Sequence, residues 1–367
     1  MTSPADVRRW ETLVQKSPAR DVYYLPAYVD ASTEMEQSDP VAIFGGSDPC
    51  AILAPLLIRR MSVVVDASSR TEWKDACSPY GYGGLLGLST TRKVDQGHVR
   101  SFLEDLQNWC SENQLVCCVL RLHPLMCQES WFAGASDWPV GKIVFRGPTS
   151  AIDLNDWNHS LNQPSSLRRD RRADMRSAGR ALRVTWNQGD DHGVHASLDL
   201  FSRLYNQNLD RLDAEMFYRF SPTYFYRLAA LGEHLGIALT WHGEEVVGGN
   251  LFLLGWRYAH GHLAGTNQIG RKYGASTLLL VEGSRRARQR GCELLNLGGG
   301  MRSGDSLEDY KRSFGGPSHR YAFFVLIADP ERFEHICRIP NAPWPYSMSI
   351  LRTDPIAREL PNMLRIA

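Results

Sequence analysis

The sequence predicts an α/β protein with mixed sheets, built of two related modules. In the first third of the chain, two β-rich runs flank turn residues at 45–49, which indicates a hairpin. An amphipathic helical pattern over 99–112 then leads into an apolar strand at 116–122. After about residue 195 a similar order of hairpin, strand, helix and strand returns. One order of elements in both halves favours two modules of the same fold.

The individual elements follow from local patterns. In the first module the hairpin strands are expected at 41–44 and 51–58, and the glycine- and tyrosine-rich segment 78–87 is expected to be a shaped loop. In the second module the patterns predict two helices, a hairpin that turns at 242–245, a further strand, a long helix and a buried strand: 198–208, 222–231, 237–241, 246–254, 257–264, 275–290 and 294–297.

The boundary between the modules is expected where asparagine, proline and serine accumulate, over 153–164. This gives a first domain of residues 1–152 and a second of 153–319. A strand-like run at 323–327 is expected to pack back on the first module, so segment 320–367 is assigned to it.

Composition and charge narrow the class of protein. The 367 residues are 43% hydrophobic and 22% charged, with a net charge of +1, which is typical of a soluble protein with two cores. Near-zero net charge gives no global attraction to nucleic acid. There is no apolar run long enough for a membrane span and no signal core at the start, so a cytoplasmic location is expected. The eight cysteines show no zinc spacing and are expected to be reduced thiols.

The most informative stretch is 294–315. An apolar strand runs into Gly298, Gly299 and Gly300, which predicts a hollow lined by backbone. A short helix is expected over 305–314, with Asp305 or Ser306 as N-cap and Leu307, Tyr310 and Phe314 on one face. Lys311 leaves this helix at the edge of that apolar face. Its ammonium could therefore face the glycine hollow and stabilise an oxyanion or bind an anionic group.

Several stretches of the chain resemble the FemAB/FemX-like branch of the acetyltransferase superfamily. They are 21–28, 78–84, 257–265, 275–291 and 297–314, and the pattern G-G-G…D-S-L-x-x-[FY]-K-x-x-F is the sharpest. The resemblance spans roughly residues 20 to 325. It implies two tandem modules of the GNAT fold and an activity in the class of aminoacyl-tRNA-dependent ligases that build peptide bridges. The chain lacks the coiled-coil arm of cell-wall members, which leaves a ligase with a single acceptor or a plain acyltransferase open.

The resemblance also implies site residues. Lys311 matches the lysine that lies beside the scissile ester, so it is the predicted catalytic residue. Arg219 and Tyr224 are the nearest matches to the acceptor pocket, and Tyr258 matches an aromatic residue on the strand after the hairpin. We expect His262, Gly299, Gly300, Asp305 and Tyr310 to line the same substrate site. His260 and His262 share one face of a strand, but two histidines without a third ligand make a poor metal site, so no metal is expected.

Two basic segments are candidates for holding the donor. Residues Arg271, Lys272, Gly274 and Ser276 occupy the place of the motif R/Q-x-x-G-x-G/A, with which a GNAT fold holds the pyrophosphate of coenzyme A at a helix N-terminus. Ser276 departs from that motif, so the same turn could hold a nucleic-acid phosphate, or be an ordinary turn. Segment 166–176 contains five arginines, among them Arg168 and Arg172, which would suit phosphate contacts. A solvated helix face balanced by acidic residues is the alternative.

We therefore expect a transferase that makes an amide bond, with an aminoacyl-tRNA as donor and an amine of a small molecule or peptide as acceptor. No nucleophile triad, Walker loop or dinucleotide motif is present, so neither a covalent intermediate nor a cofactor is expected. An N-acyltransferase that uses acyl-coenzyme A is the alternative. A binding module without catalysis is a third possibility.

Overall fold

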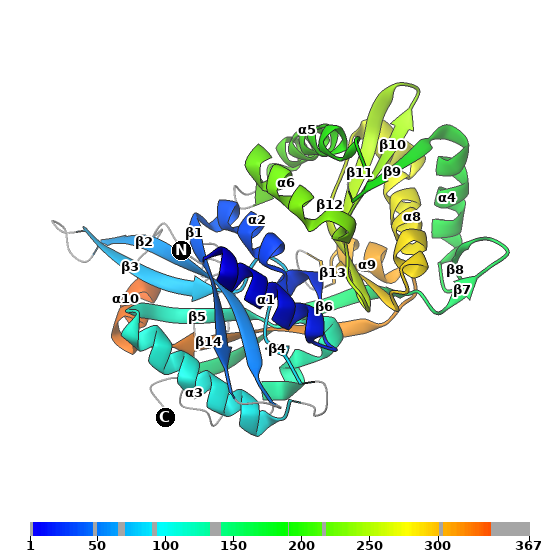
Figure 1. Ribbon diagram of the computed structural model, residues 1–367. Coiled ribbons are helices and arrows are strands. Elements are labelled where there is room, and N and C mark those ends of the chain that lie inside the picture. The colour runs from blue at the N-terminus through cyan, green and yellow to red at the C-terminus, as the bar shows by residue number, and fades with distance from the viewer. Residues whose placement is uncertain are drawn as a thin grey trace. The chain divides into compact units, whose positions relative to one another are not determined.

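The computed structural model describes residues 3–46, 50–64, 70–89, 94–132, 141–189, 191–214, 218–300 and 304–338 (Figure 1). The chain divides into two compact units. Unit 1 contains Met1–Arg146 and the chain from Arg320 onward, and unit 2 contains Gly147–His319. Each unit is built on a mixed sheet, so the predicted fold class is confirmed.

Unit 1 contains strands of a mixed sheet together with helices. The strands follow the order β1-β2-β3-β5-β14, and only β3 and β5 run parallel. Their bounds are β1 Ser38–Gly45, β2 Ile52–Val64, β3 Arg70–Cys77, β5 Leu115–Arg121 and β14 Ser318–Ile327, and a short β4, Leu86–Gly87, pairs with β2. The helices are α1 Pro4–Lys16, α2 Pro26–Glu36, α3 Gln96–Glu112 and α10 Pro330–Arg338, with 3-10 turns at Val22–Tyr24, Pro124–Met126 and Gln128–Phe132.

The core of unit 1 lies between its sheet and α3. Every residue of β5 is buried, because this strand has neighbours on both edges and helices over its faces. The chain's return through β14 is part of this core, since Phe324 and Leu326 are fully buried beside residues of α3. Segment 323–327 pairs antiparallel with Cys117–Arg121 of β5.

The strands of unit 2 follow the order β6-β13-β12-β11-β10-β9, in which only β12 and β13 run parallel, and the unit contains β6 from Gly147 onward. The strands are β6 Gly141–Asp153, β9 Arg183–Gln188, β10 Leu235–His242, β11 Glu245–Leu254, β12 Tyr258–Thr266 and β13 Leu294–Gly298, with a small separate pair, β7 Trp157–Asn158 and β8 Gln163–Pro164. The helices are α4 Arg169–Ala181, α5 Val194–Leu212, α6 Pro222–Leu228, α7 Gln268–Tyr273, α8 Ala275–Gln289 and α9 Ser306–Arg312, and α6 continues into a 3-10 segment, Ala229–His234.

The two faces of this second sheet are covered by different helices. At Gly248 of β11 an added Cβ would meet Ala275 and Leu279 of α8, whereas at the next residue, Gly249, it would meet Phe201 of α5. Because side chains alternate along a strand, α8 and α5 lie on opposite faces. Helix α4 packs against α8. Glycine at both positions lets the two helices approach the strand closely.

The elements largely agree with the sequence patterns, and the differences are local. The helix expected over 222–231 ends at Leu228, and the following segment contains Gly232 with φ +53° and ψ −126°, which does not fit an α-helix. The expected loop before the long helix contains the short α7, which begins where the Asn267 side chain accepts from the Gly270 amide. None of the described helices combines the length and the apolar character that a membrane crossing requires.

Candidate active site

Helix α9 begins at a well-defined cap. The Asp305 carboxylate accepts from the Glu308 amide at 2.7 Å, and the buried Glu308 carboxylate accepts from the Gly304 amide at 2.9 Å. These two bonds satisfy amides that a helix start leaves unpaired. They fix the direction in which α9 leaves the chain, and thereby the position of Lys311 in its last turn.

The Lys311 ammonium lies against the glycine segment that follows β13. Its Nζ donates to the Gly299 carbonyl at 2.6 Å. Burial lowers the pKa of Lys311 from its ordinary 10.5 to about 8, and the nearby Asp305 carboxylate opposes this shift. At neutral pH the side chain is therefore largely protonated, yet its ammonium is poorly hydrated. Such a charge is available to a ligand group that develops negative charge.

Lys311 is part of the wall of a cavity of about 280 Å³ within unit 2. Four elements besides α9 contribute, and the lining is mostly aliphatic and glycine: Gly249, Asn250, Gly261, His262, Leu263, Ala264, Ser276, Leu279, Leu280, Leu297, Leu307 and Tyr310. Leu307, which the sequence placed on the apolar face of α9, is 39% exposed and lines this cavity. The site is thus an apolar pocket with a few polar groups, as small-molecule sites usually are.

His262 enters the cavity through an irregularity of β12. Leu251 pairs with Leu263 and Phe252 pairs with Gly261, so His262 is an extra residue opposite β11. Such a bulge redirects a side chain. The His262 Nε2 lies 2.5 Å from the Tyr224 hydroxyl, which α6 supplies. Burial, assisted by His260, lowers the pKa of His262 to about 3, so the imidazole is neutral at pH 7.

A second cavity, of about 230 Å³, surrounds the junction of α7 and α8. Its lining includes Arg271, Lys272, Gly274 and Ser276. Gly274 ends α7 and precedes α8 with φ +75°, a conformation that favours glycine. The first turn of α8 borders this cavity, where the positive end of the helix dipole favours an anion. Ser276 and Tyr310 belong to both cavities, so the two adjoin.

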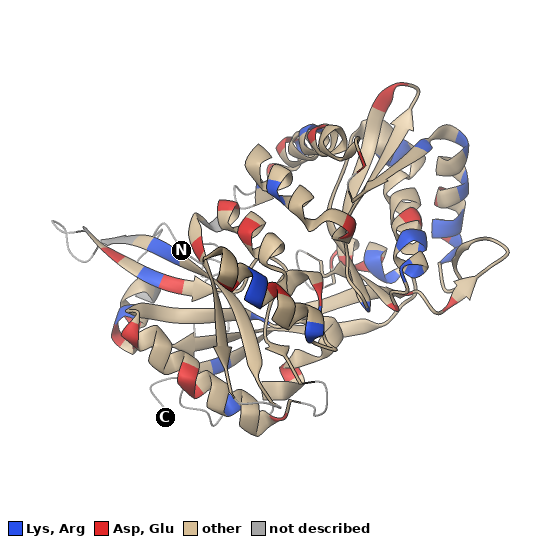
Figure 2. Ribbon diagram, in the orientation of Figure 1, with Lys and Arg blue, Asp and Glu red and all other residues tan. Residues whose placement is uncertain are grey.

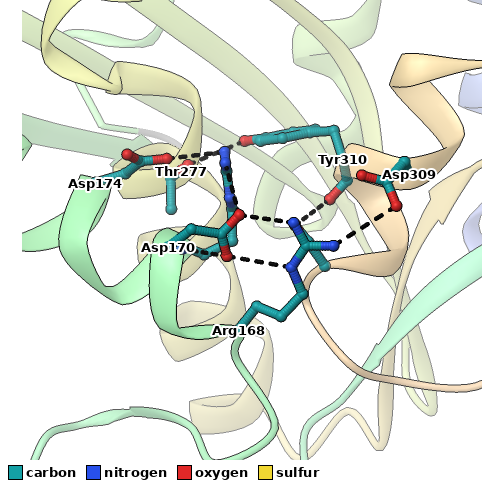
Figure 3. Close-up of polar contacts among 8 residues, drawn as sticks. Arg168, Asp170, Asp174, Thr277, Asp309 and Tyr310 are labelled. Atoms are coloured by element: carbon teal, nitrogen blue, oxygen red, sulfur yellow. Dashed lines mark hydrogen bonds and ion pairs between the residues drawn. The ribbon is translucent and has the colours of Figure 1, made fainter.

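Tyr310 is held between these cavities by contacts from α8 and α4. Its hydroxyl lies 3.3 Å from the Thr277 hydroxyl (Figure 3). The Arg171 guanidinium lies 5.3 Å from the centre of the Tyr310 ring. Burial raises the pKa of Tyr310 to about 12, so it is protonated at pH 7. Arg171 also forms ion pairs with Asp174 at 2.8 Å and Asp170 at 3.2 Å.

Arg168 belongs to the same network of ion pairs, so its guanidinium is engaged within the protein. Its guanidinium pairs with Asp170 at 2.7 Å and with Asp309 of α9 at 3.6 Å (Figure 3). The pKa of Asp170 is held well below its ordinary value by these arginines, Arg168 first. The ion pairs tie α4 to the helix that carries Lys311.

The structure brings one group of the expected residues together. Residues Tyr310, Lys311 and His262 line the larger cavity, Tyr224 contacts His262, and Gly299 contacts Lys311. The expected donor residues Arg271, Lys272, Gly274 and Ser276 line the smaller cavity.

Other expected site residues lie elsewhere or are engaged locally. Arg219 pairs with Asp210 at 2.6 Å, and Tyr258, at the start of β12, is buried beneath Arg257; neither lines a described cavity. The Asp305 carboxylate caps α9. Gly300 borders Gly299 but lines neither cavity, and Arg172 lines neither of them either. The Gly298 amide donates to the Asn296 side chain at 3.0 Å, so it is not part of an open hollow.

Several contributors to these walls were not singled out by sequence reasoning, among them Arg171, Asp174 and Asn250. Arg171 and Asp174 reach the smaller cavity from α4, and Asn250 lies on the wall of the larger one while only 3% exposed. Asn250 is the one polar residue in the otherwise apolar run 246–254, and this pattern could have marked it as a site candidate. No local sequence pattern indicated that α4 lies next to α8, because this proximity depends on tertiary packing.

Part of the chain is similar to a known family of domains. Residues 165–312 match the family model described as the acetyltransferase (GNAT) domain. This matched region contains the lining residues of both cavities and Lys311.

Solved structures agree over nearly the whole chain. FemX has a TM-score of 0.65 at 12% identity, over 90% of this chain and 98% of that chain. L-PGS from Bacillus licheniformis has a TM-score of 0.53 at 12% identity, over 91% and 96%. The C-terminal domain of a protein assigned as a lysylphosphatidylglycerol synthetase from Agrobacterium fabrum has a TM-score of 0.57 at 14% identity, over 92% of this chain and 98% of that chain. At these identities the likeness establishes the fold, and it confirms the expected resemblance to FemX-like proteins at that level. No curated protein matches the chain.

Proposed function

We propose that this protein transfers an aminoacyl group from an aminoacyl-tRNA to an amine of a small-molecule or peptide acceptor, forming an amide. The observation that carries the proposal is the Lys311 ammonium, part-buried at the wall of an apolar cavity. The GNAT match over 165–312 and the FemX-like fold support an acyltransferase. The resemblance of the 297–314 stretch to the FemAB/FemX-like pattern favours aminoacyl-tRNA as the donor.

The proposed reaction needs no covalent intermediate. The neutral acceptor amine attacks the ester carbonyl, a C–N bond forms, and the C–O bond to the terminal ribose breaks. One amine proton ends on the ribose oxygen that leaves, so atoms and charge balance without a further cofactor. Lys311 acts on the carbonyl oxygen, which becomes negative in the transition state. His262 is not suited to be the base, because a pKa of about 3 lies far below that of an amine.

The adjoining cavities suit an elongated donor. A phosphate at the first turn of α8, near Arg271 and Lys272, would place the acyl end of the same molecule beside Tyr310 and Lys311. The 3′ end of an aminoacyl-tRNA has this layout. Acyl-coenzyme A has it as well, and the cavity around Gly274 favours an acyl-coenzyme A-dependent N-acyltransferase as the second candidate.

One experiment separates the two donors. Purified protein is incubated with a metabolite extract and either a mixed pool of aminoacyl-tRNAs or a set of acyl-coenzyme A thioesters, and products are sought by mass spectrometry. We expect an amide-sized mass gain with the tRNA pool, and its loss when ribonuclease is added first. Product from the thioesters that ribonuclease leaves unchanged would replace the proposal with the second candidate. Absence of product from both donors would favour a binding module.

A further inference from the structure

One side of helix α4 is lined with arginines. Arg169, Arg172, Arg176 and Arg180 follow one another at steps of three, four and four residues, so they share a face about 80° wide. Arg172 is half-buried and the other three are exposed. Within the described part of the chain, their guanidinium groups have no ion-pair or hydrogen-bond partner. We call these four residues the arginine stripe; Figure 2 shows basic residues along α4.

The rest of α4 explains why the charge of the stripe is uncompensated. Ala178 is buried in the core and Met175 packs against it, so this side of the helix faces inward. Both acidic residues of the helix, Asp170 and Asp174, are paired with Arg171, and Asp170 also with Arg168. Six arginines and two aspartates between 168 and 180 leave a net charge of +4, although the whole chain carries only +1.

We propose that the arginine stripe binds the phosphate backbone of the donor tRNA. This inference rests on the proposed function and adds to it a surface that lies outside both cavities. The stripe extends over eleven residue steps, from Arg169 to Arg180, which is about 16 Å, and its members are separated by a rise of about 5 Å. A guanidinium holds a phosphate through paired hydrogen bonds. A row of them at this spacing suits successive phosphates of one RNA strand, and duplex RNA is recognised chiefly through its backbone and shape.

The composition of the exposed face argues for RNA rather than an anionic membrane. Helices that bind at a membrane interface carry Trp, Phe or Leu beside their basic residues. The exposed residues of α4 between the arginines are Ala173, Ser177 and Gly179, which offer almost no apolar surface for insertion. A solvated row of charges without apolar neighbours is typical of a phosphate-binding surface.

The test measures the salt dependence of RNA binding. Fluorescein-labelled, uncharged tRNA is titrated with the protein between 50 and 200 mM salt. In the variant with Arg169→Gln, Arg172→Gln, Arg176→Gln and Arg180→Gln, we expect the slope of log affinity against log salt to fall by about 3 to 4, since each phosphate contact contributes about 0.9. Affinity at the lowest salt should drop roughly tenfold or more.

Two matched controls isolate the charge of the stripe. Arginine to lysine at the same four positions keeps the charge and should keep most of the slope. Arg203→Gln removes an exposed arginine from α5, on the other face of the sheet, and should leave the slope unchanged. Glutamine and lysine are good helix formers, so circular dichroism and thermal melting should show an intact fold in each variant.

Steady-state kinetics separate this inference from the proposed function. With aminoacyl-tRNA as donor, the glutamine variant should raise KM for the tRNA at least tenfold, whereas Lys311→Met should lower kcat and retain tRNA binding. An unchanged KM and salt slope in the glutamine variant, while wild type turns over aminoacyl-tRNA, would overturn the stripe alone. Loss of binding to phosphatidylglycerol vesicles with tRNA binding unchanged would overturn it in favour of a membrane surface. Failure of wild type to use aminoacyl-tRNA would instead remove the proposed function.

Discussion

At the scale of single residues, the chemistry depends on a lysine that is both charged and poorly hydrated. The Lys311 Nζ has one protein partner, the Gly299 carbonyl, among the contacts within the described residues. A carbonyl does not neutralise a positive charge as a carboxylate would, so the ammonium can still respond to a developing oxyanion. An electrostatic role of this kind predicts that charge at position 311 matters more than shape.

Replacing the charge should slow turnover without unfolding the protein. A preorganised oxyanion donor is worth about 3 kcal/mol of barrier, so Lys311→Ala and Lys311→Met should each lower kcat by roughly a hundredfold or more. The fold should persist, because removal of a buried charge relieves desolvation. Single-turnover rates and thermal melting provide the measurement. Rates within a few-fold of wild type in the methionine variant would remove Lys311 from the mechanism.

The pH dependence of the rate should report the same group. The pKa of Lys311 is about 8 in the folded protein and 10.5 ordinarily. Above pH 8 the ammonium is lost, so kcat should fall with an apparent pKa near 8, after correction for spontaneous hydrolysis of the donor without enzyme. A value of kcat that continues to rise above pH 8 would mean that Lys311 acts as a base instead.

The stability of the fold should change with pH in the opposite sense. Between pH 8 and 10.5 the unfolded chain binds more protons at this site, so the contribution of Lys311 to the free energy of unfolding rises with pH.

The pair formed by Tyr224 and His262 should position the acceptor rather than exchange protons. Because the pKa of His262 is about 3, its imidazole stays neutral across the working range. Tyr224→Phe removes the hydroxyl 2.5 Å from Nε2 and should raise KM for the acceptor severalfold, with the shape of the pH profile unchanged. The pH profile of the rate is measured while the concentration of each substrate is varied in turn. A shifted acidic limb in the phenylalanine variant would indicate that the pair takes part in proton transfer.

At the scale of elements, the start of α9 determines where Lys311 lies. The Asp305 side chain accepts from the Glu308 amide, and the loss of such a cap typically costs about 1 kcal/mol. Asp305→Ala should therefore lower stability by about that amount and reduce kcat, because α9 frays towards its functional end. Asp305→Asn retains a capping oxygen and should recover most of the stability. Chemical denaturation and kcat together check this; equal loss of kcat in both variants would assign a direct role to the carboxylate.

The sequence predicted elements better than it predicted which side chains meet. The hairpin of β10 and β11 and the helix α8 follow from local periodicity, and the structure contains both. Capping chemistry indicated Asp305 or Ser306 as the N-cap of α9, and the structure has Asp305 there. Arg219 and Tyr258 were placed in the substrate site by alignment to a family pattern, whereas in the structure Arg219 pairs with Asp210 and Tyr258, the first residue of β12, lines neither described cavity. Such pairings depend on the three-dimensional neighbours of each residue, which no local pattern records.

The bulge at His262 and the ion pairs of Arg168 illustrate the same limit. An extra residue in β12 is visible only against the register of β11. The density of arginines in α4 was visible in the sequence, but which of them face inward to Asp170, Asp174 and Asp309 depends on packing against α8 and α9. The sequence therefore located the basic helix without separating its paired arginines from its unpaired ones.

At the scale of the whole molecule, the order of the chain interleaves the two units. Unit 2 is one continuous segment, whereas unit 1 needs the chain from Arg320 onward, which returns after unit 2 is complete. Segment 323–327 of β14 pairs with β5 and supplies buried residues to the core of unit 1. Unit 1 can therefore complete its folding only after the segment that forms unit 2 has been synthesised.

This arrangement predicts that a cavity in β14 weakens unit 1 specifically. Phe324 is fully buried, with its ring centre 4.6 Å from that of Phe132, so Phe324→Ala should lower the free energy of unfolding by about 3 to 5 kcal/mol. Hydrogen exchange should show the loss of protection in β5 and α3. The matched control is Leu279→Ala in α8, which is 1% exposed in the core of unit 2 and should act on β11 and β12 instead. Equal loss of protection throughout the chain in both variants would mean that the two units unfold as one cooperative body, because local cavities would then be felt globally.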